Sequence, residues 1–126
     1  MHELYNLLQA RVQLINIRMM YWKEIPVQVE FTEEKIKKTA QLDEKFQIAV
    51  DSIAMKDGSY GSDDYLDSWE WVNMDPVNEE LNDEFIQKYV SKYIFPKDFI
   101  KKLSSSIDDG TRKGTPGSID SWIVNK

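Results

Sequence analysis

The stretch Tyr21-Trp22-Lys23-Glu24-Ile25-Pro26-Val27-Gln28-Val29 predicts two strands joined at a tight bend. Aromatic and β-branched residues, which favour strands, dominate both halves. Pro26 has no backbone N–H to donate to a strand ladder, so it belongs at a strand edge or start. The bend then falls on Lys23–Ile25. Because packing does not explain the charged pair Lys23-Glu24, we expect the proline-braced tip to present both side chains to solvent beside Trp22.

The residues on either side extend these two strands. Apolar side chains occupy both alternating faces from Ile17 to Trp22, and apolar and polar residues alternate from Val27 to Thr32. Residues 36–42 predict a third strand, with Lys38 as an edge residue that discourages pairing with another chain. The sequence therefore predicts a small antiparallel sheet of two or three strands over about residues 17–42.

A helix is predicted over about residues 44–57, directly after the sheet. Asp43 is a favourable N-cap, because its carboxylate accepts a hydrogen bond from a first-turn amide. Gly58 is the expected C′ residue, since glycine adopts positive φ without strain. The core-facing positions follow helical spacing and comprise Phe46, Ala49, Val50, Ile53 and Ala54.

Further helices are predicted in the second half of the chain. Ser62 is the expected cap of a short helix from Asp63 to about Trp71, and Asn78 that of a helix over about 79–93. One or two more turns are expected after Pro96. Residues 104–118 are rich in Ser, Gly and Thr, which favours a mobile segment. The apolar end at 119–124 is expected to dock back on the domain or on a partner.

These elements predict an α+β fold, in which the small sheet packs against two or three helices. Residues 17–103 form the expected domain, and residues 104–126 the expected flexible tail with an apolar end. Residues 1–16 form an N-terminal extension, for which the spacing over 3–15 leaves a short amphipathic helix and an extended lead-in as alternatives.

Composition narrows the classes of function. The 126 residues include no cysteine, which excludes disulfides, thiolate metal sites and a cysteine nucleophile. The net charge of −6 disfavours a nucleic-acid partner, because phosphates repel an acidic chain. No stretch has the composition of a secretory signal or of the ~20 apolar residues of a membrane span. We therefore expect a cytoplasmic protein without a nucleic-acid or membrane partner.

Catalytic signatures are scarce. The single histidine, His2, lies at the N-terminus, where an ordered catalytic partner is unusual. Neither a Gly-rich phosphate loop nor a nucleotide-binding motif occurs. An acidic cluster could hold a divalent cation, but complementing a helix N-terminus and facing water is the favoured interpretation. We predict no catalytic residue, no metal and no cofactor. The acidic cluster comprises Asp63, Asp64, Asp67 and Glu70.

The aromatic residues are the better candidates for binding. The spacings of Trp22, Trp69, Trp71 and Tyr89 favour core positions, yet Trp and Tyr are also enriched at interface hot spots. Trp122 follows the predicted mobile segment and is the aromatic least expected in a core. The candidate binding residues are Tyr21, Trp22, Lys23, Glu24, Trp69 and Trp122.

Three blocks resemble the small bacterial virulence factor domain, which is also present in conserved virulence factor C. The first is residues 21–29. The second matches a helix pattern through Leu42, Phe46, Ala49, Val50, Asp51, Ala54 and Met55, and the third matches through Gly58, Gly61, Asp63, Asp64, Tyr65, Leu66 and Trp69. The resemblance covers about 17–72 and extends more loosely to about 93. It implies a family named from phenotype, without established catalytic residues, some of whose short members are encoded near folate- and corrinoid-dependent methyl-transfer proteins.

Three hypotheses follow. The first is a non-enzymatic cytoplasmic accessory or protein-interaction domain with a protein partner, linked through the resemblance to folate/corrinoid one-carbon methyl transfer. The alternative is a small-molecule-binding protein or a simple enzyme that uses a carboxylate beside Trp69 for acid/base chemistry. The third is a homo-oligomer built through an exposed strand edge.

Overall fold

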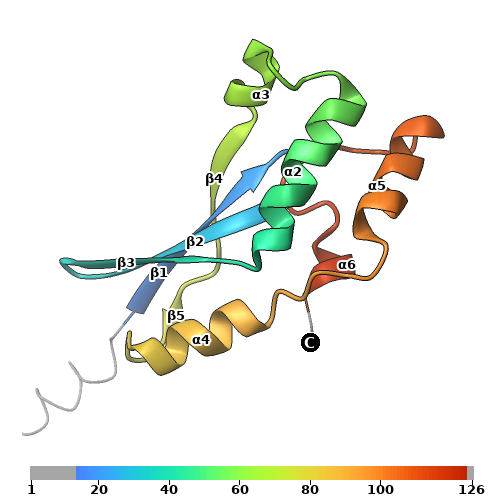
Figure 1. The fold of residues 1–126 in the computed structure, drawn as a ribbon. Helices are drawn as coiled ribbons and strands as arrows, with labels where there is room; N and C mark the ends of the chain where they lie inside the picture. Colours follow the sequence, from blue (N-terminus) through green and yellow to red (C-terminus); the bar gives the residue numbers. More distant parts are fainter. Residues whose placement is uncertain (1–13, 125–126) are drawn as a thin grey trace, which may run out of the picture.

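The computed structural model describes residues 14–124, which form an antiparallel sheet with helices packed mainly on one of its faces (Figure 1). Four strands lie in the order β3-β2-β1-β4, and a short fifth strand pairs with the first residues of β1. The strands are β1 (Leu14–Trp22), β2 (Ile25–Glu33), β3 (Ile36–Gln41), β4 (Trp69–Asn73) and β5 (Val77–Asn78). The α+β class is confirmed, but the sheet is larger than the two or three strands predicted.

The extra strands come mainly from a segment that was predicted to be helical. Helix α3 ends at Asp67, and Trp69 begins β4. Trp69 and Trp71 alternate with Glu70, as in a strand, and pair with Trp22 and Met20 of β1. The predicted helix over Asp63 to about Trp71 was therefore too long, because cross-strand packing of the two tryptophans outweighs the helical spacing of Trp69 to Tyr65.

The helices lie beside the sheet as Figure 1 shows, with α2, α4 and α5 over the same face. Helix α2 packs on β2 and on α5, and α4 packs on β3. The helices are α2 (Glu44–Asp57), α3 (Asp63–Asp67), α4 (Asp83–Ser91), α5 (Phe99–Asp108) and α6 (Asp120–Ile123). The helix expected over 3–15 lies almost entirely outside the described residues, but Leu14 and Ile15 belong to β1 and pair with β5.

The helix ends test the predicted caps. The Asp43 carboxylate accepts from the Lys45 amide at 3.0 Å, and Gly58 adopts φ of 85°, so both predicted boundaries of α2 are confirmed. Helix α4 starts later than predicted, because the Asn82 side chain, rather than that of Asn78, accepts from the Phe85 amide at 2.8 Å. The Ser62 side chain makes no cap hydrogen bond to α3.

The C-terminal part of the described chain is packed on the domain. Helix α5 continues through Ser104 to Asp108, so the prediction of a mobile segment from that residue was wrong. Leu103, Ile119 and Ile123 are buried, and Val124 forms an isolated bridge with Tyr93. The apolar end therefore docks on the domain, which is one of the two predicted outcomes. Its apolar side chains complete a core that the sheet and α2 leave open.

Candidate functional site: a pocket beside the β1–β2 turn

Lys23 and Glu24 connect β1 to β2, with Trp22 and Ile25 paired on either side. Lys23 adopts φ of 51°, a left-handed conformation that is uncommon for residues other than glycine. Its amide donates to the Ser68 carbonyl at 3.2 Å, which anchors the turn to the residue before β4. The side chain of Glu24 is fully buried, so the prediction of a solvent-exposed charged tip was wrong.

Arg112, from the loop after α5, explains why Glu24 is buried. Its guanidinium donates from Nε and Nη2 to the two carboxylate oxygens of Glu24, both at 2.7 Å. The third nitrogen, Nη1, donates to Asp57 at the end of α2, at 2.8 Å. Lys23 donates to the same Asp57 oxygen at 2.9 Å and to the exposed Asp64, also at 2.9 Å. We call Lys23, Glu24, Asp57 and Arg112 the ion-pair cluster.

The cluster joins three parts of the chain, and its hydrogen bonds shift the pKa values of Asp57 and Arg112. Burial favours the neutral form of Asp57, but hydrogen bonds from Arg112, Ser59 and Lys23 outweigh it and lower the pKa of this carboxyl well below its usual range. Burial opposes the charge of Arg112 as well, yet hydrogen bonds to Glu24 and Asp57 raise its pKa. The four charges sum to zero, so the cluster is a neutral clasp between the β1–β2 turn, α2 and the loop after α5.

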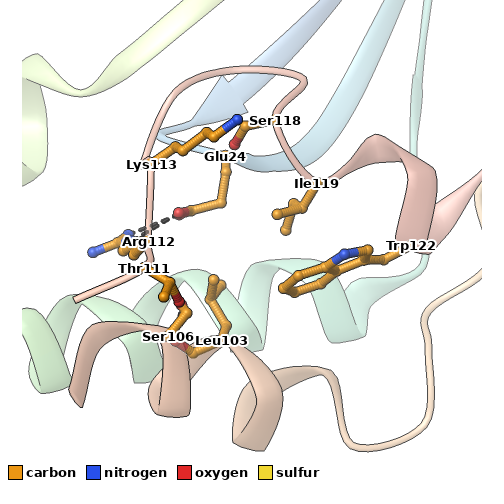
Figure 2. A pocket seen from close by; sticks show the side chains of 9 residues that line it. All are labelled: Glu24, Leu103, Ser106, Thr111, Arg112, Lys113, Ser118, Ile119 and Trp122. Atoms are coloured by element: carbon orange, nitrogen blue, oxygen red, sulfur yellow. Dashed lines mark hydrogen bonds and ion pairs between the residues drawn. The ribbon is translucent and has the colours of Figure 1, made fainter. Parts of the chain in front are cut away.

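A pocket of about 160 Å³ lies next to the clasp, between the β1–β2 turn, α5 and the chain leading into α6 (Figure 2). We call it the turn pocket. Its apolar wall is formed by Leu103, Ile119 and the half-buried Trp122. Glu24 and Arg112 form part of its polar wall, together with other residues of the loop between α5 and α6, which we call the crossing loop. The remaining lining residues are Ser106, Thr111, Lys113 and Ser118.

Two further polar groups distinguish this pocket. The Ser118 hydroxyl is buried and has no hydrogen-bond partner among the described residues, which is uncommon for a buried polar atom. The Lys102 ammonium, which does not line the pocket, lies 4.0 Å from the centroid of the Trp122 ring in a cation–π contact. Trp122 is therefore held in place while part of its surface remains accessible.

An acid–phenol pair includes Asp120, the residue that follows Ile119. The Tyr21 hydroxyl donates to Asp120 Oδ2 at 2.7 Å. Burial raises the pKa of Asp120, partly offset by this hydrogen bond, and burial together with the neighbouring carboxylate raises the pKa of Tyr21. The pair attaches α6 to β1 and does not itself line the turn pocket. It therefore helps to hold in place the loop before α6, whose residues do line the pocket.

The structure places the predicted binding residues in three environments. Tyr21 and Trp22 are fully buried, and the Trp22 indole donates to the Tyr65 carbonyl at 2.9 Å, so neither can contact a partner directly. Glu24 and Trp122 meet in the turn pocket. Lys23 and Trp69 instead border a separate groove, which also contains Gly114. A direct binding role stays a prediction for Lys23, Glu24, Trp69 and Trp122.

Three lining residues that were not predicted from the sequence lie in the crossing loop, namely Arg112, Lys113 and Ser118. Their surroundings are rich in Gly and Ser, which favoured the interpretation as a mobile segment. The available signal was Arg112 itself, a single arginine in a polar loop of an acidic chain. Nothing local identified Glu24 as its partner, because 88 residues separate them.

The carboxylates of the acidic cluster face solvent. Asp64, Asp67 and Glu70 are all exposed, whereas acid/base catalysis at neutral pH needs a carboxylate in an apolar environment. Within residues 14–124, no group of three or more carboxylate, histidine or cysteine side chains is arranged to hold a metal ion. The same residues include no helix long and apolar enough to cross a membrane.

A comparison with protein families finds one whose description is "Virulence factor", matching residues 20–93. This span is more than half of the chain, and the chain therefore belongs to the virulence factor family. It contains the β1–β2 turn and Asp57, but not Arg112, Ser118 or Trp122, so the family match covers only one side of the turn pocket. No curated protein and no solved structure matches the chain.

Proposed function

We propose that this member of the virulence factor family is a non-enzymatic protein-interaction domain, which holds one side chain of a partner protein in the turn pocket. The size of the pocket carries the proposal. Its volume of about 160 Å³ is close to that of a cavity known to hold benzene, ~150 Å³, and smaller than the ~300–1,000 Å³ of ordinary small-molecule sites. It has room for one side chain of a larger partner.

The lining supports a protein partner. Tryptophan is enriched at the hot spots of interfaces, where an anchor residue fills a well-packed pocket. Trp122 forms such a wall here, with Leu103 and Ile119 beside it. The ion-pair cluster and the Tyr21–Asp120 hydrogen bond hold this wall on both sides, which lowers the entropy lost when a partner binds.

The arrangement of carboxylates argues against acid/base catalysis in the pocket. Both oxygens of Glu24 accept hydrogen bonds from Arg112, and the lowered pKa of Asp57 keeps that group ionised. A general acid or base needs a proton that it can exchange near neutral pH. These two groups are instead committed to ion pairs that shape the pocket.

We extend the proposal to an accessory role in the cytoplasm, with a partner from folate- or corrinoid-dependent methyl transfer. This extension is supported by the sequence resemblance in residues 21–69 to short members encoded near such proteins. Its test is a binding measurement between the purified chain and a purified corrinoid-dependent methyl-transfer protein from the same organism. An affinity weaker than millimolar would overturn this extension and leave the interaction role in place.

The main test fills the pocket without touching the clasp. Ser106 lines the turn pocket, whereas Ser105, the preceding residue of α5, is exposed. Ser106→Met is expected to occlude the pocket, and Ser105→Met is the matched control. Immobilised wild type, Ser106→Met and Ser105→Met are compared for the proteins that they retain from native lysate, and each retained protein is then titrated in purified form.

A partner that binds the wild type and Ser105→Met equally, and Ser106→Met at least tenfold more weakly, would support the proposal. Partners that bind all three chains equally, or no partner at all, would refute it. Circular dichroism of both variants before the comparison ensures that lost binding reports on the pocket and not on unfolding.

A further inference from the structure

The turn pocket has an apolar part and a polar part within a small volume. Leu103, Ile119 and Trp122 supply the apolar part. The polar part includes the buried Ser118 hydroxyl, whose hydrogen-bonding capacity is unused among residues 14–124. A buried hydroxyl without a partner is costly, so a ligand atom that accepts its hydrogen bond would remove that cost.

The charge around the polar part is positive. Lys113 lines the pocket and is exposed, and it forms no ion pair with any described residue. In the view of Figure 2, Lys113 and Ser118 lie at the same side of the pocket, opposite Leu103 and Ser106. Glu24 does not oppose this charge, because Arg112 neutralises it through two hydrogen bonds.

We infer that the turn pocket binds the C-terminal residue of a partner chain, with an aliphatic side chain against Trp122 and the terminal carboxylate on Ser118 and Lys113. This inference rests on the proposed function and names the chemistry of the partner. In a pocket of about 160 Å³, an apolar group and a carboxylate must lie within a few ångströms of each other. A C-terminal residue meets this condition, because its side chain and its carboxylate leave the same Cα. Capture of a C-terminal carboxylate is a recurring mode of peptide recognition.

An acidic residue next to an aliphatic one fits the pocket less well. Its carboxylate would extend from a neighbouring Cα, so the two groups would lie farther apart than the side chain and carboxylate of one C-terminal residue. An aliphatic side chain is also smaller than the benzene that a comparable volume holds, so room remains for the carboxylate.

The test uses N-acetyl-L-leucine, which carries the carboxylate, and N-acetyl-L-leucinamide, which has the same side chain without the charge. Both are titrated into the ¹⁵N-labelled full chain, and the shifts of the Trp122 indole N–H and the Ser118 and Lys113 amides are followed. We expect the acid to bind with a Kd in the millimolar range, as suits so small a ligand, and at least fivefold more tightly than the amide.

Three variants test whether the preference for the acid arises in the pocket. Lys113→Gln is expected to reduce the affinity for the acid to within about twofold of that for the amide. Lys35→Gln removes a lysine at the distant β2–β3 turn and is expected to leave both affinities unchanged. Ser118→Ala is expected to weaken the binding of both the acid and the amide, since the Ser118 hydroxyl can donate to a carbonyl oxygen of either ligand.

Equal affinities for the acid and the amide, shifts away from Trp122, or the absence of millimolar binding would overturn the inference. An acidic side chain as the true ligand would appear as stronger binding of N-acetyl-leucyl-aspartate amide than of N-acetyl-leucine. If these probes fail while Ser106→Met still loses a partner, the proposed function stands and the C-terminal chemistry is wrong. If Ser106→Met loses no partner either, both are refuted.

Discussion

Replacing Arg112 with methionine should strongly destabilise the fold, because it leaves the buried carboxylate of Glu24 without a partner. The Glu24 side chain is 1% exposed and the Arg112 side chain 13% exposed. Among the described residues, every hydrogen bond to the Glu24 carboxylate comes from Arg112. Asp57 keeps hydrogen bonds from Lys23 and Ser59, so most of the cost falls on Glu24.

The magnitude follows from the burial of the pair. Removing one partner of a buried ion pair costs about 3–5 kcal/mol, whereas an exposed pair contributes about 0–1 kcal/mol. Methionine retains part of the apolar stem of Arg112, so the loss reports mainly on the charge. If the free energy of unfolding falls by about 2 kcal/mol per molar urea, this cost lowers the urea midpoint of unfolding by roughly 2 M.

Urea unfolding, followed by circular dichroism and tryptophan fluorescence, measures this difference. Lys56→Met is the matched control, because Lys56 pairs with Asp108 at 2.7 Å but both side chains are largely exposed, at 40% and 66%. That variant should lose less than about 1 kcal/mol. The same assay on Glu24→Leu and on the double variant Glu24→Leu/Arg112→Met completes a double-mutant cycle.

The cycle decides whether the two residues act as a pair. The double variant should lose at least about 2 kcal/mol less than the sum of the single variants, because it leaves no uncompensated charge at either position. Additive losses, or an Arg112→Met variant within about 0.5 kcal/mol of the wild type, would show that the clasp is not formed in solution.

Three further predictions concern other parts of the fold. Trp22→Phe should lower the free energy of unfolding by about 2–3 kcal/mol in urea, since it removes buried volume and the hydrogen bond to the Tyr65 carbonyl. Gly58→Ala should cost about 1 kcal/mol by thermal unfolding, because φ is 85° there although the space around a Cβ is open; an unchanged Tm would contradict this. The lowered pKa of Asp57 means that its stabilising effect is complete above about pH 5 and is lost as pH falls below about 4 towards its folded value. Unfolding of the wild type and Asp57→Asn at neutral and acidic pH should therefore show a difference that shrinks with falling pH.

The elements whose signals are local could be predicted from the sequence. Helix α2 has its cap at Asp43, its stop at Gly58 and a regular apolar stripe between them, and each signal lies within a few residues of the structure that it specifies. The strands on either side of the β1–β2 turn were predicted for the same reason. By contrast, Trp69–Asn73 becomes a strand because β1 pairs with it, and that pairing spans about 50 residues of chain.

The candidate site was predicted only in part, because its chemistry depends on contacts that are distant in sequence. Glu24 and Trp122 were identified as unusual residues, one for its unexplained charge and the other for its place near the C-terminus. The sequence could not show that Arg112 pairs with Glu24, or that α6 brings Trp122 into the same pocket. Polar composition also favoured mobility for the loop that carries Arg112, although Arg112 ties this loop to Glu24 and Asp57.

The ion-pair cluster couples stability to the shape of the turn pocket. Arg112 lines the pocket and also holds the loop that supplies Thr111, Lys113 and Ser118, so opening the clasp removes the polar wall and the buried ion pair together. A ligand that binds only the closed form must stabilise the fold, by RT ln(1 + [L]/Kd). For N-acetyl-leucine at ten times its Kd, this amounts to about 1.4 kcal/mol in the wild type. The gain should disappear in Glu24→Leu/Arg112→Met, which we expect to fold because it leaves no uncompensated charge. The same gain in both chains would mean that the pocket does not depend on the clasp, and the loop would then be held by the Tyr21–Asp120 contact alone.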